Sequence, residues 1–159
     1  MVLEVLQFQM PKLLPPFIFL ILLAALTLLS LIHPQTLGQV HQSGVPLVEV
    51  AFIVAVGLIF LIGARIQFNR NDSEIMTFDQ PRNLVTDGLF RMSRNPMYLG
   101  FTLLLVAASL MVNLWCALLA PAAFFLLANY WYIPFEEAAS KDIFGDDYEQ
   151  YQNHTRRWL

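Results

Sequence analysis

Long apolar stretches separated by short polar ones are the main pattern of this chain. Two stretches, residues 13–32 and 45–68, are long enough to cross a bilayer, which takes a helix of about 20 residues. Two further stretches, a short one at 97–112 and a longer one at 114–133, follow each other with only Asn113 as a polar interruption, which predicts a tight helical hairpin. The pattern therefore predicts an all-α, multi-pass membrane protein with four transmembrane helices.

The polar stretches complete the predicted architecture. Residues 69–96 are rich in arginine, aspartate and turn signals, so we expect an aqueous loop there. Residues 134–159 are predicted to form a short amphipathic helical tail, in which Gly145 ends one helix. Asp146 followed by Glu149 resembles a capping box that opens a second helix. The whole chain is predicted to form a single membrane domain.

Composition supports the membrane interpretation and excludes several kinds of function. Hydrophobic residues make up 57% of the chain and charged residues 13%, too few to cover the surface of a soluble domain. The net charge is −3, so we expect no nucleic-acid partner. Cys116 has no second cysteine to pair with and lies in an apolar stretch, where packing is its expected role. We also expect no metal site.

The positions of the basic residues predict the orientation of the chain. In a four-span arrangement every Lys and Arg falls on one side of the membrane, whereas residues 33–44 and the turn at Asn113 contain none. Basic residues accumulate on the cytoplasmic side of membrane proteins. Both termini and the loop 69–96 are therefore predicted to be cytoplasmic, in the cell membrane if the organism is a prokaryote.

Two polar motifs are predicted to meet at this cytoplasmic face. Arg91 and Arg94 precede the third span, and Glu136 and Glu137 follow the fourth, so an antiparallel hairpin brings them together. The free N–H groups and positive dipole at the start of the third helix, beside the arginines, suit a carboxylate or phosphate. In the alternative, structural interpretation Asn95 is an N-cap, the arginines anchor the interface and the glutamates form a solvated helix end.

Four motifs in this order resemble one protein family. They are residues 84–91 (LVTDGLFR), residues 93–100 (SRNPMYLG), the pair Glu136-Glu137, and residues 144–151 (FGDDYEQY). The chain resembles the isoprenylcysteine carboxyl methyltransferase-like proteins, which are related to phospholipid methyltransferases, over about residues 77–159. The resemblance implies a multi-pass enzyme that binds S-adenosylmethionine at the cytoplasmic interface.

The resemblance also implies a set of site residues. Arg94 would pair with the cofactor's carboxylate, Tyr98 would lie near its sulfonium, and Gly100 would allow close approach. The two glutamates would take ribose hydroxyls or the amino group, and the tail would close over the site as a lid. The candidate catalytic residues are Arg94, Glu136 and Glu137, and the candidate cofactor-binding residues are Arg91, Arg94, Asn95, Tyr98, Gly100, Glu136, Glu137, Tyr148, Tyr151 and His154.

The acceptor of the methyl group is left open by the sequence. Asn95 stands where the prenylcysteine enzymes usually have histidine, and asparagine cannot act as a general base. A carboxylate or thiolate acceptor needs no base, whereas a protonated amine needs His154, Glu136 or Glu137 to take its proton. We expect a lipophilic or lipid-linked acceptor of one of these three kinds, entering from the membrane lipids.

Two other functions are compatible with the sequence. A membrane reductase would bind NADPH against the same face, with Arg156 and Arg157 available for its phosphates. A non-enzymatic membrane module would use the arginine and glutamate motifs only as anchors and caps. The three functions differ in their ligand: a methyltransferase binds S-adenosylmethionine, a reductase binds NADPH, and a non-enzymatic module binds neither.

The predicted orientation can be tested by labelling single cysteines in intact cells. A cysteine at Gly38 is expected to be labelled from outside, because its loop carries no basic residue, while a cysteine at Arg82 is expected to be protected. Labelling of both positions from the same side would contradict the four-span arrangement.

Overall fold

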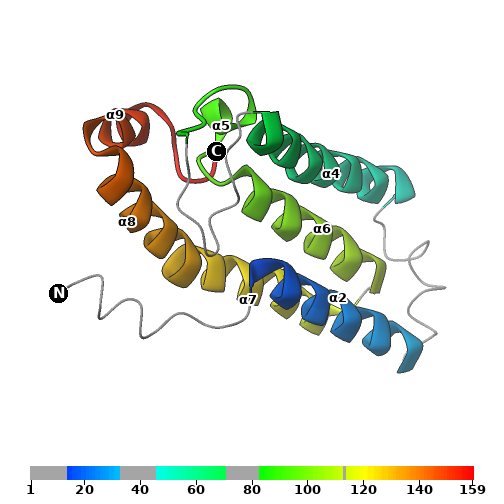
Figure 1. Ribbon diagram of the computed structural model, residues 1–159. Coiled ribbons are helices and arrows are strands. Elements are labelled where there is room, and N and C mark those ends of the chain that lie inside the picture. Colours follow the sequence, from blue (N-terminus) through cyan, green and yellow to red (C-terminus); the bar gives the residue numbers. More distant parts are fainter. Residues whose placement is uncertain (1–13, 33–45, 71–82, 113) are drawn as a thin grey trace.

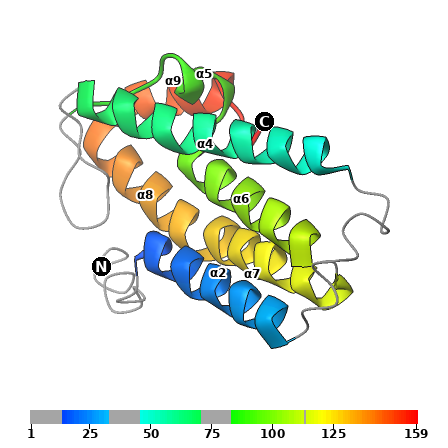
Figure 2. The same ribbon diagram turned by 90° about the vertical axis from the view of Figure 1, so that its right-hand side faces the viewer.

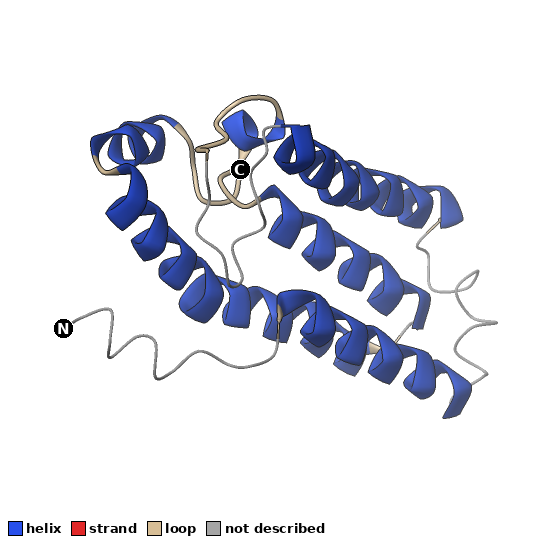
Figure 3. Cartoon of the chain, viewed as in Figure 1, coloured by secondary structure: helices blue, strands red, loops and turns tan. Residues whose placement is uncertain are grey.

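The described part of the chain is built from helices. A computed structural model describes residues 14–32, 46–70, 83–112 and 114–159, and these residues contain no strand (Figure 3). Asn113, Gly38 and Arg82, on which the predicted hairpin turn and orientation depend, lie outside the described residues, as does the N-terminus. The helices are α2 (Pro15–Ile32), α4 (Leu47–Arg70), α5 (Leu89–Met92), α6 (Pro96–Val112), η1 (Trp115–Leu118), α7 (Leu119–Leu127), η2 (Ala128–Tyr132), α8 (Ile133–Phe144) and α9 (Asp146–His154).

Three of these helical segments are long and apolar enough to cross a membrane. They are α2, α4 and the continuous segment Trp115–Phe144, while α6 is a shorter apolar helix. Val48 and Phe52 on α4 are 72% and 69% exposed, as expected where hydrocarbon rather than water is the solvent. The all-α, multi-pass membrane fold is thus confirmed. The single domain and the cytoplasmic orientation stay predictions.

Helix α6 is the centre of the bundle. It packs against α4 on one side and against α2 and α7 on the other, as both views show (Figures 1 and 2). Leu105, at its middle, is fully buried, and Phe101 packs against Phe19 of α2 with ring centroids 4.8 Å apart. The first residues of α6 are consequently held by three neighbouring helices.

Glycines allow α4 and α6 to pack closely. A Cβ atom added to Gly100 would lie 2.8 Å from the carbonyl oxygen of Gly57 and 2.9 Å from the backbone nitrogen of Leu61. These are backbone atoms of α4, which cannot move aside as a flexible side chain can. Small residues at such contacts are how membrane helices gain packing contacts without a hydrophobic driving force.

The fourth apolar helix extends further than the expected span 114–133. It continues through α8 to Phe144, so Glu136 and Glu137 lie within a helix and not at its end (Figure 1). Pro134 has no N–H to donate and its ring crowds the preceding turn, which would normally break an α-helix. Here the wider π turn η2 directly precedes it, and the helix passes through this position with a bend.

The polar tail turns back over the bundle at Gly145. This residue has φ 53°, a left-handed conformation that glycine adopts without strain, and it ends α8 as expected. Helix α9 begins at Asp146, with Gly145 in the N-cap position and no side-chain cap. The predicted capping box is therefore wrong, because Asp146 is already inside the helix.

The close contact between α4 and α6 makes a prediction about stability. Gly100→Ala should lower the free energy of unfolding by about 1–3 kcal/mol, since the added methyl group forces two backbones apart. Thermal unfolding of the detergent-solubilised protein measures this loss. Gly63→Ala is the control, because its Cβ would meet only the end of the Leu89 side chain. Equal melting temperatures for the two variants would contradict the packing argument.

Candidate functional site

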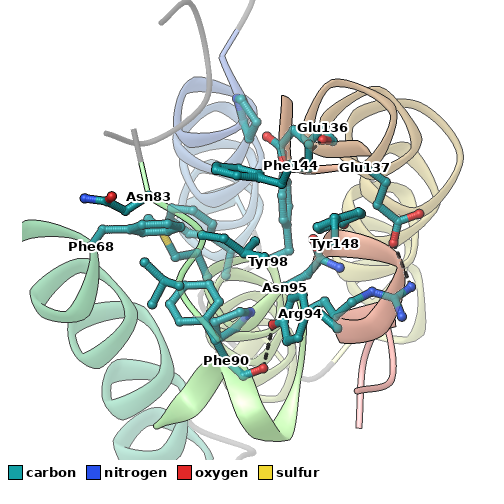
Figure 4. Close-up of a pocket in the computed structure, with 18 of the residues that line it drawn as sticks. Phe68, Asn83, Phe90, Arg94, Asn95, Tyr98, Glu136, Glu137, Phe144 and Tyr148 are labelled. Atoms are coloured by element: carbon teal, nitrogen blue, oxygen red, sulfur yellow. Dashed lines mark hydrogen bonds and ion pairs between the residues drawn. The ribbon is translucent and has the colours of Figure 1, made fainter. Parts of the chain in front are cut away.

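A cavity lies where the first turn of α6, the middle of α8 and helix α9 meet (Figure 4). Its empty volume is about 990 Å³ with the open mouth included. It is lined by Pro15, Pro16, Phe68, Asn83, Leu84, Val85, Phe90, Arg94, Asn95, Pro96, Met97, Tyr98, Phe101, Glu136, Glu137, Ser140, Phe144, Tyr148 and Tyr151. Most of these side chains are apolar or aromatic, and few are charged.

Glu137 forms the centre of an ion-pair network beside the cavity. Its Oε1 accepts a hydrogen bond from Nη2 of Arg94 at 2.9 Å, and its Oε2 accepts one from Nη2 of Arg157 at 2.5 Å. The side chains of Glu137 and Arg94 are each only 12% exposed. Figure 4 shows the Glu137 carboxylate and the Arg94 guanidinium facing each other. These contacts join α8, the start of α6 and the C-terminal segment.

Arg94 also binds the backbone of the tail. Its Nη1 donates to the carbonyl oxygens of Gln152 and Thr155, at 3.1 and 2.6 Å. Its Nε is buried and has no hydrogen-bond partner within the described residues. An unpaired buried donor costs about 1–3 kcal/mol, so this atom is a natural place for a ligand acceptor.

The C-terminal segment is fastened along the entry to α6. The carbonyl oxygen of Arg157 accepts hydrogen bonds from Oγ of Ser93 at 3.2 Å and from Nδ2 of Asn95 at 3.0 Å. Nε1 of Trp158 donates to Oδ1 of Asn129, in the π turn, at 3.1 Å. The segment after α9 thus bridges the third and fourth apolar helices.

Glu136 faces different surroundings from Glu137. Its Oε1 accepts a hydrogen bond from the hydroxyl of Tyr98 at 2.9 Å, and within the described residues it has no ion-pair partner. Consecutive residues on a helix point about 100° apart, because the helix has about 3.6 residues per turn. Glu137 therefore faces the arginines, while Glu136 faces Tyr98 at the cavity wall.

Tyrosines of α9 close the opposite wall. Burial raises the pKa of Tyr148 to about 12, and the Glu137 carboxylate adds to this shift. Burial also raises the pKa of Tyr151, whose hydroxyl donates to the carbonyl oxygen of Phe90 at 2.5 Å. Both side chains are neutral at physiological pH. They serve as walls and hydrogen-bond donors, not as bases.

The loop before α6 is shaped by a side chain of α4. The side-chain Oε1 of Gln67 accepts a hydrogen bond from the backbone N–H of Leu89 at 3.0 Å, and its side-chain Nε2 donates to the carbonyl oxygen of Asp87 at 3.2 Å. Gly88, with φ 53°, leaves space for this amide, which a Cβ would meet at 1.9 Å. The turn directs Phe90 into the cavity.

The structure brings most of the predicted site residues together. Arg94, Asn95, Tyr98, Glu136, Glu137, Tyr148 and Tyr151 line the cavity. Arg91 is exposed and does not line it, and Gly100 faces the backbone of α4. His154 is also exposed, with Nδ1 placed 2.7 Å from the carbonyl oxygen of Gln150.

Sequence reasoning missed the partners of Glu137 and several cavity walls. Arg157 was considered only for the phosphates of a nucleotide, yet its guanidinium turns inward to Glu137. Asn129 and Phe68 belong to none of the sequence motifs. A polar residue inside an apolar span, such as Asn129, was the one available signal, because such residues usually bind a partner within the bundle.

Comparisons with known proteins identify the family of this chain. The family model described as phospholipid methyltransferase matches residues 47–147. Two "probable protein-S-isoprenylcysteine O-methyltransferase" sequences, from Oryza sativa subsp. indica and subsp. japonica, are each 31% identical over 85 residues. The match covers 52% of this chain and 43% of each rice protein, so the chain spans less than half of their length.

A bacterial relative is shorter. An uncharacterized protein of Haemophilus influenzae is 38% identical over 63 residues, which is 40% of this chain and 100% of that protein. No solved structure matches the chain. The family model covers more than half of the chain, including Arg94 just before α6 and Glu137 on α8. This protein therefore belongs to the phospholipid methyltransferase family, together with the isoprenylcysteine methyltransferase-like proteins that it resembles.

Proposed function

We propose that this protein transfers a methyl group from S-adenosylmethionine to a lipophilic acceptor at the cytoplasmic membrane interface. The observation that carries the proposal is the cavity, whose polar wall is made by Arg94, Glu136 and Glu137. All three belong to the stretch matched by the family model. The cytoplasmic placement is supported by the positions of the basic residues.

The residues of the cavity fit S-adenosylmethionine. The unpaired Nε of Arg94 is a donor suited to a carboxylate. The rings of Phe90, Phe144 and Tyr148 suit an adenine base and a cationic sulfur, which aromatic faces attract. When bound, the cofactor supplies a methyl carbon activated by its bond to a positively charged sulfur.

The protein's own residues then act mainly by positioning. Glu137 and the carbonyl oxygens of Gln152 and Thr155 fix the Arg94 guanidinium in one orientation before any ligand binds. Such preorganisation supports an in-line displacement, which depends on the alignment of the reacting atoms. The aromatic walls exclude water, the competing nucleophile. Pro15 and Phe101, on membrane helices, line the side suited to a lipophilic acceptor.

The two alternative functions are less well supported. A reductase would need Arg156 and Arg157 for phosphates, but Arg157 is engaged by Glu137 and the side chain of Arg156 is exposed, outside the cavity. A module without a ligand would use Arg94 as an interfacial anchor, whereas that side chain is 12% exposed and turned inward. Both observations favour a methyltransferase.

Replacing Arg94 tests the cofactor site. Arg94→Gln should weaken S-adenosylhomocysteine binding by about 10- to 100-fold, because it removes a charged hydrogen bond worth about 1.5–3 kcal/mol. Isothermal titration of the purified, folded protein measures the affinity. Arg91→Gln is the matched control and should bind like the parent, since Arg91 is exposed and outside the cavity.

The folded state of each variant must be checked first, because Arg94 also pairs with Glu137. Monodisperse elution and a cooperative melting transition serve for this. Equal affinities of the Arg94→Gln variant and the parent would refute the proposed cofactor site. So would a parent protein that binds NADPH but not S-adenosylhomocysteine.

A further inference from the structure

Arg157 binds Glu137 more completely than Arg94 does. Its Nε donates to Oε1 at 3.1 Å and its Nη2 donates to Oε2 at 2.5 Å, so the two side chains form a bidentate pair. Arg94 makes one hydrogen bond to the same carboxylate, from Nη2 to Oε1 at 2.9 Å. Arg94 lines the cavity, whereas Arg157 does not. The arginine outside the cavity wall is therefore the main partner of the glutamate.

The hydrogen bonds of this cluster also define its net charge. Both oxygens of Glu137 accept from guanidinium groups, which have donors only, as an ionised carboxylate does. Two arginines and one carboxylate together carry one positive charge. Without the Arg157 side chain, Arg94 and Glu137 would form a simple pair with no net charge.

The net positive charge lies where a ligand can reach it. The Nε atom of Arg94 is buried and has no hydrogen-bond partner within the described residues, and the Arg94 side chain lines the cavity. Because Arg157 already occupies both oxygens of Glu137, the charge of Arg94 is not cancelled by its own partner. An anionic group in the cavity would meet a fixed and uncompensated guanidinium.

We propose that Arg157 is a positioning residue of the cofactor site, which occupies Glu137 and so keeps Arg94 available for the carboxylate of the methyl donor. This inference rests on the proposed function and adds to it a residue that does not touch the ligand. Arg157 acts through Glu137 alone. Its effect should be confined to ligands that carry a carboxylate, because a neutral group at the same place gains little from a net positive charge.

The C-terminal segment has attachments that do not need the Arg157 guanidinium. Ser93 and Asn95 both donate to the backbone carbonyl oxygen of Arg157. The ring of Trp158 stacks on Phe125 of α7 with centroids 4.6 Å apart. These contacts remain when the Arg157 side chain is replaced. The path of the segment is thus expected to survive the substitution, while the charge of the cluster changes.

The test measures the binding of two ligands that differ in one group. S-adenosylhomocysteine and its carboxamide analogue, which has a neutral amide in place of the carboxylate, are titrated calorimetrically into the purified, folded protein. The variants are Arg157→Gln, Arg157→Lys and the double variant Arg157→Gln with Glu137→Gln. The double variant leaves Arg94 as the one charged member of the cluster and so restores the net charge of the parent.

Arg156→Gln is the matched control. It removes the same charge from the neighbouring position of the same segment, but the Arg156 side chain is exposed and does not line the cavity. Within the described residues, that side chain has no ion pair with a carboxylate. This variant should bind both ligands like the parent.

The expected result is a loss of affinity that depends on the charge of the ligand. Arg157→Gln should weaken S-adenosylhomocysteine binding by about 5- to 30-fold, the order expected when one nearby unit charge is removed at the effective dielectric of a protein surface. Its affinity for the carboxamide should be unchanged. Both Arg157→Lys and the double variant should recover most of the lost affinity for S-adenosylhomocysteine.

Three results would overturn the inference. One is an equal affinity of the Arg157→Gln variant and the parent for S-adenosylhomocysteine. Another is an equal loss of affinity for both ligands, which would mean that Arg157 only holds the tail in place. The third is a folded double variant that binds S-adenosylhomocysteine no better than Arg157→Gln, because a broken tether is not repaired by removing its second half.

The double variant also carries the test if Arg157→Gln does not fold. It must then keep most of the parent's affinity for S-adenosylhomocysteine, and loss of that affinity in the folded double variant would overturn the inference. A parent that fails to bind S-adenosylhomocysteine would instead refute the proposed function, which the results for Arg157 leave standing.

Discussion

The pairing of Glu137 with two arginines is the interaction on which the site depends. Glu137 lies inside a helix that crosses the membrane, where an unpaired charge costs several kcal/mol and is rarely tolerated. Its partners come from the start of α6 and from the segment after α9. A single carboxylate therefore ties three parts of the chain together. Without it, the tail would keep its backbone hydrogen bonds to Ser93, Arg94 and Asn95 but would lose its ion pair with α8.

Membrane packing explains why the cavity forms at this end of the bundle. Gly57 in the middle of α4 and Gly100 in the second turn of α6 bring these helices into close backbone contact, so they leave no space there. Beyond the last turns of α4, the loop held by Gln67, helix α8 and helix α9 enclose the cavity. Past the bend at η2 and Pro134, α8 carries Glu136 and Glu137, which point about 100° apart and so have different neighbours. The packing of the helices therefore also positions the charged side chains of the site.

The sequence predicts the apolar helices and much of the site, but not the contacts that complete it. Uninterrupted apolar runs predicted the spans, because a bilayer imposes a minimum length on each. Motif order placed Arg94 near Glu137, since a hairpin brings them together. Local rules failed at Pro134, where a π turn preserves the helix, and at Gly100, which packs against α4. The role of Arg157 was unpredictable, because it depends on the path of the tail after α9.

The central claim is that this cavity holds the methyl donor. Ultraviolet cross-linking of labelled S-adenosylmethionine to the purified protein, followed by mass spectrometry of its peptides, tests it most directly. The account predicts adducts on the aromatic walls, within residues 90–101 or 133–151, and their loss when excess S-adenosylhomocysteine competes. Adducts confined to other parts of the chain, or adducts that S-adenosylhomocysteine does not displace, would contradict it.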